Sequence, residues 1–215
     1  MKLAPEGRPF VLIGAAVLGG LLAGTAAFGG LWWIGVALWT PVAVWVPVFF
    51  RDPVRTGPPC PALVLAPADG KVVSIEQVHE PDYMGGLATR VSVFMNIFSV
   101  HVNRHPVTGV VEYRDYRPGK FLNATLDKAS TDNECMSLGV RSKRGPVLIR
   151  QIAGLVARRI VTDHVPGDAV HQGRRLGMIR FGSRVDTFLP PGVSIKVRVS
   201  DTAVAGKTIL AEWPQ

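Results

Sequence analysis

The stretch Met178-Ile179-Arg180-Phe181-Gly182-Ser183-Arg184-Val185-Asp186 lies near the C-terminal end of a chain of 215 residues. Apolar and polar residues alternate on both sides of Gly182, and this pattern predicts a strand that the glycine interrupts. A glycine within a strand pattern indicates a bulge or a backbone that another group approaches closely, because glycine has no Cβ. Taken alone, the pair Gly182-Ser183 is typical of a turn.

Three other motifs precede this stretch in the chain. They are Phe49-Phe50-Arg51-Asp52-Pro53, Ala66-Pro67-Ala68-Asp69-Gly70-Lys71-Val72 and His101-Val102-Asn103-Arg104. Together with Phe181-Gly182-Ser183-Arg184, and in this order, they resemble the motifs of phosphatidylserine decarboxylases. The resemblance covers nearly the whole chain. It is to the short form of the family, in which Phe-Gly-Ser-Arg replaces the Leu-Gly-Ser-Thr of longer members.

The resemblance implies a self-made cofactor. In that family the Gly-Ser bond cuts itself and the serine becomes a pyruvoyl group, so scission is expected between Gly182 and Ser183. The two fragments, 1–182 and 183–215, would form a heterodimer. The resemblance further implies that the pyruvoyl ketone from Ser183 forms a Schiff base with the amine of phosphatidylserine. It would then accept electrons as carbon dioxide leaves, and the product would be phosphatidylethanolamine.

Scission from within requires a hydroxyl that attacks its own preceding carbonyl, here Ser183 Oγ and the Gly182 carbonyl carbon. A serine hydroxyl is a weak nucleophile and needs an adjacent base. The resemblance implies that His101 is this base and that Asp69 orients its ring, because histidine titrates near neutral pH and a carboxylate stabilises the imidazolium. From the residues alone, Asp69 is typical of a turn in which the side chain bonds its own backbone, and His101 of a polar strand face.

Two further residues are secondary candidates. Longer members of the family carry a second histidine three residues after the first. Here that position is Arg104, and His105 follows it. The other histidines match no motif and are predicted to lie on the surface or in turns: His79, His164 and His171.

The N-terminal part of the chain is strongly apolar. No charged residue occurs from Pro9 to Phe50, which is long enough for two helical membrane crossings of about 20 residues each. Gly29-Gly30 lies near the middle, so we expect a helical hairpin over Phe10–Phe28 and Leu31–Phe50. A cleaved signal peptide, a single bent or re-entrant helix and a soluble pair of core helices are the alternatives.

The distribution of charge indicates a membrane location. Lys2 and Arg8 precede the apolar run, and Arg51 and Arg55 follow it. Under the positive-inside rule, a hairpin places both flanks, and with them the catalytic domain, on the cytoplasmic side of the cell membrane. The net charge of +8 favours an anionic lipid surface as a partner, and no nucleic-acid-binding motif is visible. The two cysteines lack metal-ligand spacing, and no metal is expected.

The rest of the chain predicts a mainly β domain. Residues 1–50 are expected to form the anchor, 51–61 a linker and 62–215 the catalytic domain, because prolines crowd the segment before Ala62. Short β-branched runs between turn signals then predict an antiparallel, barrel-sandwich-like fold, which the family resemblance also implies. The runs are Leu63–Leu65, Lys71–Ile75, Arg90–Phe94, Gly109–Tyr113, Val147–Ile152, Ala157–Val161 and Ser194–Val199. Phe121–Lys128 is expected to form a short helix or a substrate-side loop.

Two other functions fit parts of the sequence. One is a membrane-anchored barrel-sandwich adaptor or carrier without catalysis, for which Lys71 after the Asp69-Gly70 turn would be the carrier lysine. The other is a pyruvoyl decarboxylase of a soluble amino acid. The sequence leaves the oligomeric state open, and a homo-oligomer is possible.

Overall fold

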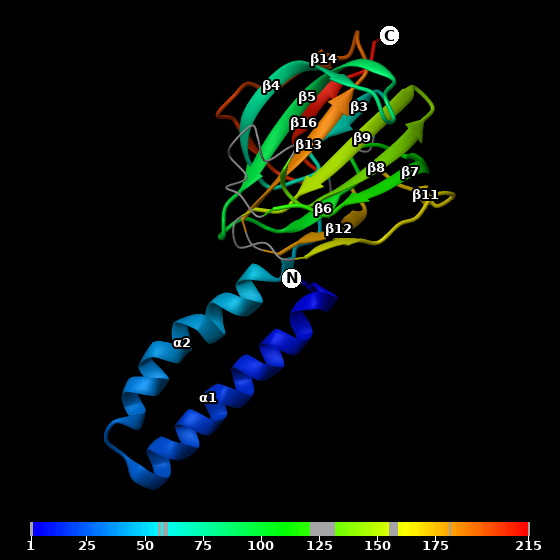
Figure 1. Cartoon of the computed structure of the whole chain (residues 1–215). Helices are drawn as coiled ribbons and strands as arrows, with labels where there is room; N and C mark the ends of the chain where they lie inside the picture. Colours follow the sequence, from blue (N-terminus) through cyan, green and yellow to red (C-terminus); the bar gives the residue numbers. More distant parts are fainter. Residues whose placement is uncertain are drawn as a thin grey trace. The chain divides into compact units, whose positions relative to one another are not determined.

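The computed structural model describes residues 2–55, 57, 60–120, 132–154, 159–180 and 182–214. The chain divides into two compact units, Met1–Val54 and Arg55–Gln215 (Figure 1). The first unit is mainly helical and the second is built from strands. The expected helix or loop at Phe121–Lys128 lies outside the described residues, as does Phe181.

The first unit is a pair of helices joined by a tight glycine turn. It contains β1 (Lys2–Leu3), the 3-10 turn η1 (Pro5–Gly7), α1 (Arg8–Phe28), α2 (Trp32–Phe49) and β2 (Arg51–Asp52). Glycines let the helices approach closely, since a Cβ on Gly24 would collide with the ring of Trp32. The Trp39 indole also donates a hydrogen bond to the carbonyl of Gly14, with an N–O distance of 3.0 Å. The two predicted helices are therefore confirmed.

Both helices have the length and composition of membrane spans. Pro5–Phe28 and Trp32–Phe49 are long and apolar enough to cross a membrane, and only 11% of an 18-residue apolar stretch of each is buried in the protein. A pair of core helices in a soluble protein would bury most of that surface. α2 continues through Pro41 and Pro47, which lie inside it.

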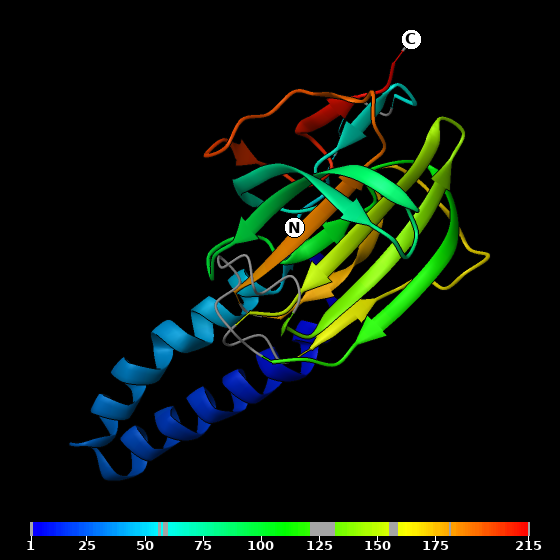
Figure 2. The same ribbon diagram turned by 45° about the horizontal axis from the view of Figure 1, so that its top comes forward.

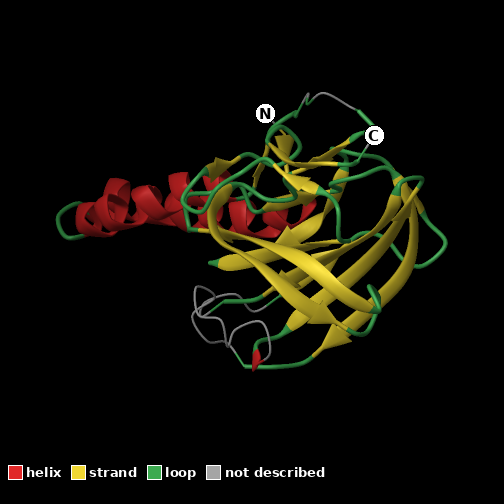
Figure 3. Ribbon diagram, turned by 90° about the horizontal axis from the view of Figure 1, so that it is seen from above, coloured by secondary structure: helices red, strands yellow, loops and turns green. Residues whose placement is uncertain are grey.

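The second unit is organised by a curled eight-stranded sheet, in which all neighbouring strands are antiparallel (Figures 2 and 3). Its strand order is β11-β7-β8-β9-β13-β5-β4-β15. In chain order, the strands are β4 (Gly70–Glu80), β5 (Gly86–Met95), β7 (Gly109–Arg117), β8 (Cys135–Ser142), β9 (Gly145–Ile152), β11 (Ala169–Val170), β13 (Ser183–Leu189) and β15 (Thr202–Ala203).

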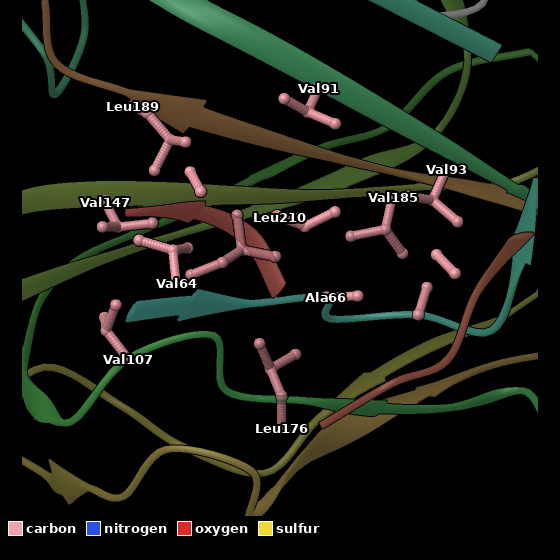
Figure 4. Packing of buried hydrophobic residues seen from close by; sticks show 14 of the residues in the cluster. Val64, Ala66, Val91, Val93, Val107, Val147, Leu176, Val185, Leu189 and Leu210 are labelled. Carbon is pink, nitrogen blue, oxygen red and sulfur yellow. The ribbon is translucent and has the colours of Figure 1, made fainter. Parts of the chain in front are cut away.

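Two smaller antiparallel sheets contribute to the same core. One contains β6 (Val102–Arg104), β10 (Ile160–Thr162) and β12 (Arg175–Ile179); the other contains β3 (Leu63–Leu65), β14 (Ser194–Ile195) and β16 (Ile209–Glu212). Leu176 from β12 and Val64 from β3 lie in one buried cluster with Val91, Val147 and Val185 of the large sheet (Figure 4). The predicted fold class, mainly antiparallel β with two N-terminal apolar helices, is confirmed.

The predicted strands were placed well where β-branched residues cluster. The runs at 63–65, 71–75, 90–94, 109–113 and 147–152 all lie within strands. The run predicted over 194–199 is shorter in the structure, because β14 ends at Ile195. Of the run predicted over 157–161, residues 160 and 161 lie in β10, and residues 157 and 158 are outside the described residues.

The stretch around Gly182 forms two strands of different sheets. β12 ends at Ile179 in a small sheet, and β13 begins at Ser183 in the large one. Gly182 has a φ of +39°, in the left-handed region that glycine tolerates best. Apart from its chain neighbours, no described residue has an atom within 4 Å of a Cβ placed on Gly182, so close approach is not the reason for the glycine. The glycine is instead explained by the left-handed backbone conformation that the chain adopts where it passes from one sheet to the other.

Candidate active site

Ser183 is the first residue of β13, which lies between β5 and β9. Its cross-strand partner on β5 is Met95. Directly opposed residues share a face of a sheet, so Ser183 points to the same side as Met95, which belongs to the buried core. Ser183 is 0% exposed, and its Oγ has no hydrogen-bond partner among the described residues. Leaving a buried hydroxyl unpaired costs about 1–3 kcal/mol, and such groups are often functional.

His101 lies just before β6 and is completely buried. Its carbonyl accepts a hydrogen bond from the Ile179 N–H at 3.4 Å, which ties it to the end of β12, three residues before Gly182. The ring Nδ1 lies 3.0 Å from the carbonyl oxygen of Ser99. A carbonyl oxygen only accepts, so Nδ1 carries the proton and Nε2 is the basic nitrogen of the neutral ring. In this tautomer Nε2 is the nitrogen that can accept a proton, and a hydrogen bond between it and Ser183 Oγ stays a prediction.

One side chain of β6, that of Asn103, contacts the cross-strand partner of Ser183. Alternation places His101 and Asn103 on one face of the extended chain. Asn103 Nδ2 lies 3.5 Å from the sulfur of Met95, the cross-strand partner of Ser183. Asn103 is thus turned towards the beginning of β13, and a contact between His101 and Ser183 stays a prediction.

Asp69 lies at the same end of the large sheet, in the turn before β4. The next residue, Gly70, packs against β5 so closely that a Cβ on it would collide with the carbonyl of Phe94. Asp69 Oδ2 forms an ion pair of 2.6 Å with Arg55, and Oδ1 accepts the Ala205 N–H at 2.7 Å. Both oxygens thus have partners other than the ring of His101. A hydrogen bond between Asp69 and His101 stays a prediction.

Arg104 and His105 lie next to each other but in different surroundings. Arg104 is 8% exposed and donates from Nη1 to the carbonyl of Gly173 at 3.1 Å. His105 is fully buried, and its Nε2 lies 3.2 Å from Nδ1 of His164. His164, predicted to lie on the surface or in a turn, is half-buried against this ring.

Similarity to known proteins covers all of these residues. The family model described as phosphatidylserine decarboxylase matches residues 43–211. The chain belongs to the phosphatidylserine decarboxylase family. A phosphatidylserine decarboxylase proenzyme of Nitrosomonas eutropha is 47% identical over 212 residues, which is 98% of this chain and 95% of the relative. One of Azorhizobium caulinodans is 46% identical over 211 residues, or 97% of this chain and 88% of the relative.

Membership of this decarboxylase family favours an enzyme over the adaptor or carrier that the sequence also allowed. Lys71, the carrier lysine of that alternative, lies within β4, opposite Phe94 of β5 and Thr202 of β15. It is paired on both sides by strands and is not at a hairpin tip.

Sequence reasoning missed a series of hydrogen-bonded side chains that ends at Met95, the cross-strand partner of Ser183. Thr162 Oγ1 lies 2.9 Å from Gln151 Oε1, Gln151 Nε2 lies 2.8 Å from Asn103 Oδ1, and Asn103 continues to Met95. Asn103 belongs to a motif that the sequence analysis recognised. Gln151 and Thr162 carry no local signal, because the topology alone brings β9 and β10 to β6.

His105 should make the decarboxylase sensitive to mild acid. Burial, and next the neighbouring His164, lower the pKa of His105 from 6.5 to about 3. Between about pH 6.5 and pH 3, the unfolded chain binds a proton at His105 and the folded chain does not. The contribution of neutral His105 to the free energy of unfolding is therefore fully present above about pH 6.5 and is lost as the pH falls towards 3. For this single group, the free energy of unfolding falls by at most about 1.4 kcal/mol per pH unit.

We expect His105→Leu to flatten the loss of thermal stability between pH 7 and pH 5, measured by melting the full chain in detergent. His79→Leu is the control, because His79 is exposed on β4. Equal slopes for wild type and both variants would contradict the assignment.

Proposed function

We propose that the chain converts phosphatidylserine to phosphatidylethanolamine with a pyruvoyl group that it makes from Ser183. The observation that carries the proposal is the buried, unpartnered hydroxyl of Ser183 directly after the left-handed Gly182. The name proenzyme, which both relatives carry, supports a step of processing.

Scission would begin at Ser183 Oγ. His101 Nε2 takes its proton as Oγ adds to the Gly182 carbonyl carbon, and collapse breaks the peptide C–N bond and returns the proton to the nitrogen of residue 183. The product is an ester. Loss of the Cα proton of residue 183 then expels the Gly182 carboxylate, and one water replaces the nitrogen as ammonia. The atoms balance with the uptake of that single water molecule.

Asp69 would stabilise the protonated form of His101. Its oxygens are bonded to Arg55 and to the Ala205 N–H, so we propose that Asp69 exchanges Arg55 for the imidazolium during the reaction. Arg104 and His105 would have supporting roles. His105 is neutral at physiological pH, because its pKa is about 3, and it is therefore a poor proton donor.

The residues around position 183 fit a pyruvoyl group. A methyl ketone has no donor of its own, and the hydroxyl it replaces has no described partner, so the change breaks no described hydrogen bond. Such a group supplies an electrophilic carbonyl that accepts electrons when a carboxylate leaves the bound amine. The next residue is fixed on the other face of β13, where Arg184 forms a buried ion pair with Asp186, with Nε–Oδ1 at 2.9 Å.

The fragments 1–182 and 183–215 would stay together as a heterodimer. β13 pairs with β5 on one side and β9 on the other, β15 pairs with β4, and β16 pairs with β3. Every sheet that the small fragment enters thus contains strands of the large one.

We further propose that α1 and α2 cross the cell membrane and keep the catalytic unit on its cytoplasmic side. Their composition supports this, as do the cations that flank them. A substrate that stays in the bilayer would then be within reach of an anchored enzyme, and the net charge of +8 suits an anionic surface.

Borohydride tests the proposal, because it reduces a ketone to an alcohol. We expect the purified chain to release carbon dioxide from phosphatidylserine in vesicles but not from free serine. Treatment with borohydride should add two hydrogens to the 183–215 fragment, as seen by mass spectrometry, and should abolish the release. Activity on free serine would instead support the soluble amino-acid decarboxylase, and an active chain that borohydride leaves unchanged would contradict both.

A further inference from the structure

Asn103 is held at the end of a directed chain of hydrogen bonds. The sulfur of Met95 can only accept, so the group of Asn103 that faces it at 3.5 Å is the NH₂. Asn103 Oδ1 then faces Gln151, which donates from Nε2 at 2.8 Å. Gln151 Oε1 in turn accepts from the hydroxyl of Thr162 at 2.9 Å. These hydrogen bonds can therefore be donated in one direction only, from Thr162 through Gln151 to Asn103, and the last donor is the Asn103 NH₂.

This amide lies over the beginning of β13. Met95 is on β5 and is the partner of Ser183, whereas Gln151 is on β9 and is the partner of Val185. β13 runs between those two strands. A side chain that contacts both Met95 and Gln151 therefore spans the inner face of β13 at Ser183. Asn103 is 0% exposed, so water does not compete for its donors.

The hydrogen-bonding capacity of this amide is not used up by its described contacts. A thioether sulfur is a weak acceptor, and an amide NH₂ has two donors. Here an amide donor faces a weak acceptor on Met95, and Met95 lies opposite a buried hydroxyl without a described partner. Such an arrangement is typical of a site that is organised for a group formed later.

We propose that Asn103 Nδ2 donates to the oxygen of the Gly182 carbonyl as Ser183 adds to it, which makes Asn103 a catalytic residue of self-cleavage. When the Oγ–C bond forms, the carbonyl electron pair moves to this oxygen, and the N–H stabilises the negative charge without giving up its proton. Gln151 and Thr162 are positioning residues that keep the NH₂ turned to the site. The inference rests on the self-cleavage proposed above.

The test separates formation of the ester from its breakdown. Hydroxylamine cleaves esters rapidly, so it reports whether Ser183 has already attacked. In full-length Asn103→Leu, we expect scission about 10²–10³-fold slower than in wild type, the loss typical of a missing oxyanion donor. Hydroxylamine should not accelerate it, because the ester fails to form. Mass spectrometry over time provides the measurement, and a thermal melt reports whether the variant is folded.

Thr162→Val is the companion variant, because it leaves Asn103 in place and Thr162 is only half-buried. It should slow scission severalfold while the melting temperature stays close to that of wild type. Normal scission in both variants would overturn the inference, as would rapid cleavage of Asn103→Leu by hydroxylamine. A wild-type chain that stays whole would overturn the proposed self-cleavage as well, whereas a wild type that cuts alongside an unaffected Asn103→Leu would overturn this inference alone.

Discussion

A chain that carries Ser183→Ala should stay in one piece and form no phosphatidylethanolamine, while the wild-type chain should be recovered as two fragments. No hydroxyl remains to attack the Gly182 carbonyl, so neither the ester nor the pyruvoyl group forms. Intact-mass analysis checks this directly. The small wild-type fragment should begin at residue 183 and be lighter by one ammonia than a fragment with a seryl terminus.

Ser92→Ala is the matched control for this experiment. Ser92 lies on β5, is 0% exposed, and has a hydroxyl without a described partner, as Ser183 does. Its cross-strand partner is Asp186, so it points to the opposite face of the sheet from Ser183. The control should cut itself normally. An active, uncut wild-type chain, or scission in Ser183→Ala, would contradict the proposed origin of the cofactor.

His101→Ala should slow scission by about 10²–10⁴-fold, the usual contribution of a general base. Asp69→Asn should also slow it strongly, because it removes the charge that would stabilise the imidazolium. If the two residues act as a unit, the double variant should be little slower than the slower single variant. Gel electrophoresis of freshly made protein over time gives all three rates.

His105→Ala provides the contrast, since His105 is adjacent in sequence to the same motif but is paired with His164. It should affect stability more than the rate of scission. A loss equal to that of His101→Ala would transfer the role of base to His105. Losses that multiply in the double variant would show that Asp69 acts independently of His101, for example through its ion pair with Arg55.

The sequence alone predicts a helix or strand correctly where its residue pattern is local and continuous. Two apolar runs around Gly29-Gly30 predicted α1 and α2 to within two residues at each end, because a helix is recognised by continuous composition. Strands rich in Val and Ile, such as β9, were also recognised. β8 was not predicted, since the segment Cys135–Ser142 contains few β-branched residues and its pairing with β7 and β9 decides its structure.

The site was less accessible to sequence reasoning because its contacts are long-range. Asp69 meets the Ala205 N–H from 136 positions away, and Gln151 meets Asn103 from 48 positions away. Neither separation leaves a periodic signal. The glycine before Ser183 was recognised as a break, but only the structure identifies it as the point where the chain changes sheets.

If the chain cuts itself as proposed, the position of β13 also sets when a newly made chain can begin to mature. β13 is among the last strands to leave the ribosome, yet it fills the gap between β5 and β9. Folding during synthesis starts from the N-terminal part, so the two flanking strands exist before Ser183 arrives between them. A chain that stops early lacks this central strand and cannot assemble the geometry for scission. Self-cleavage would then mark a polypeptide as fully translated before it acts on lipid.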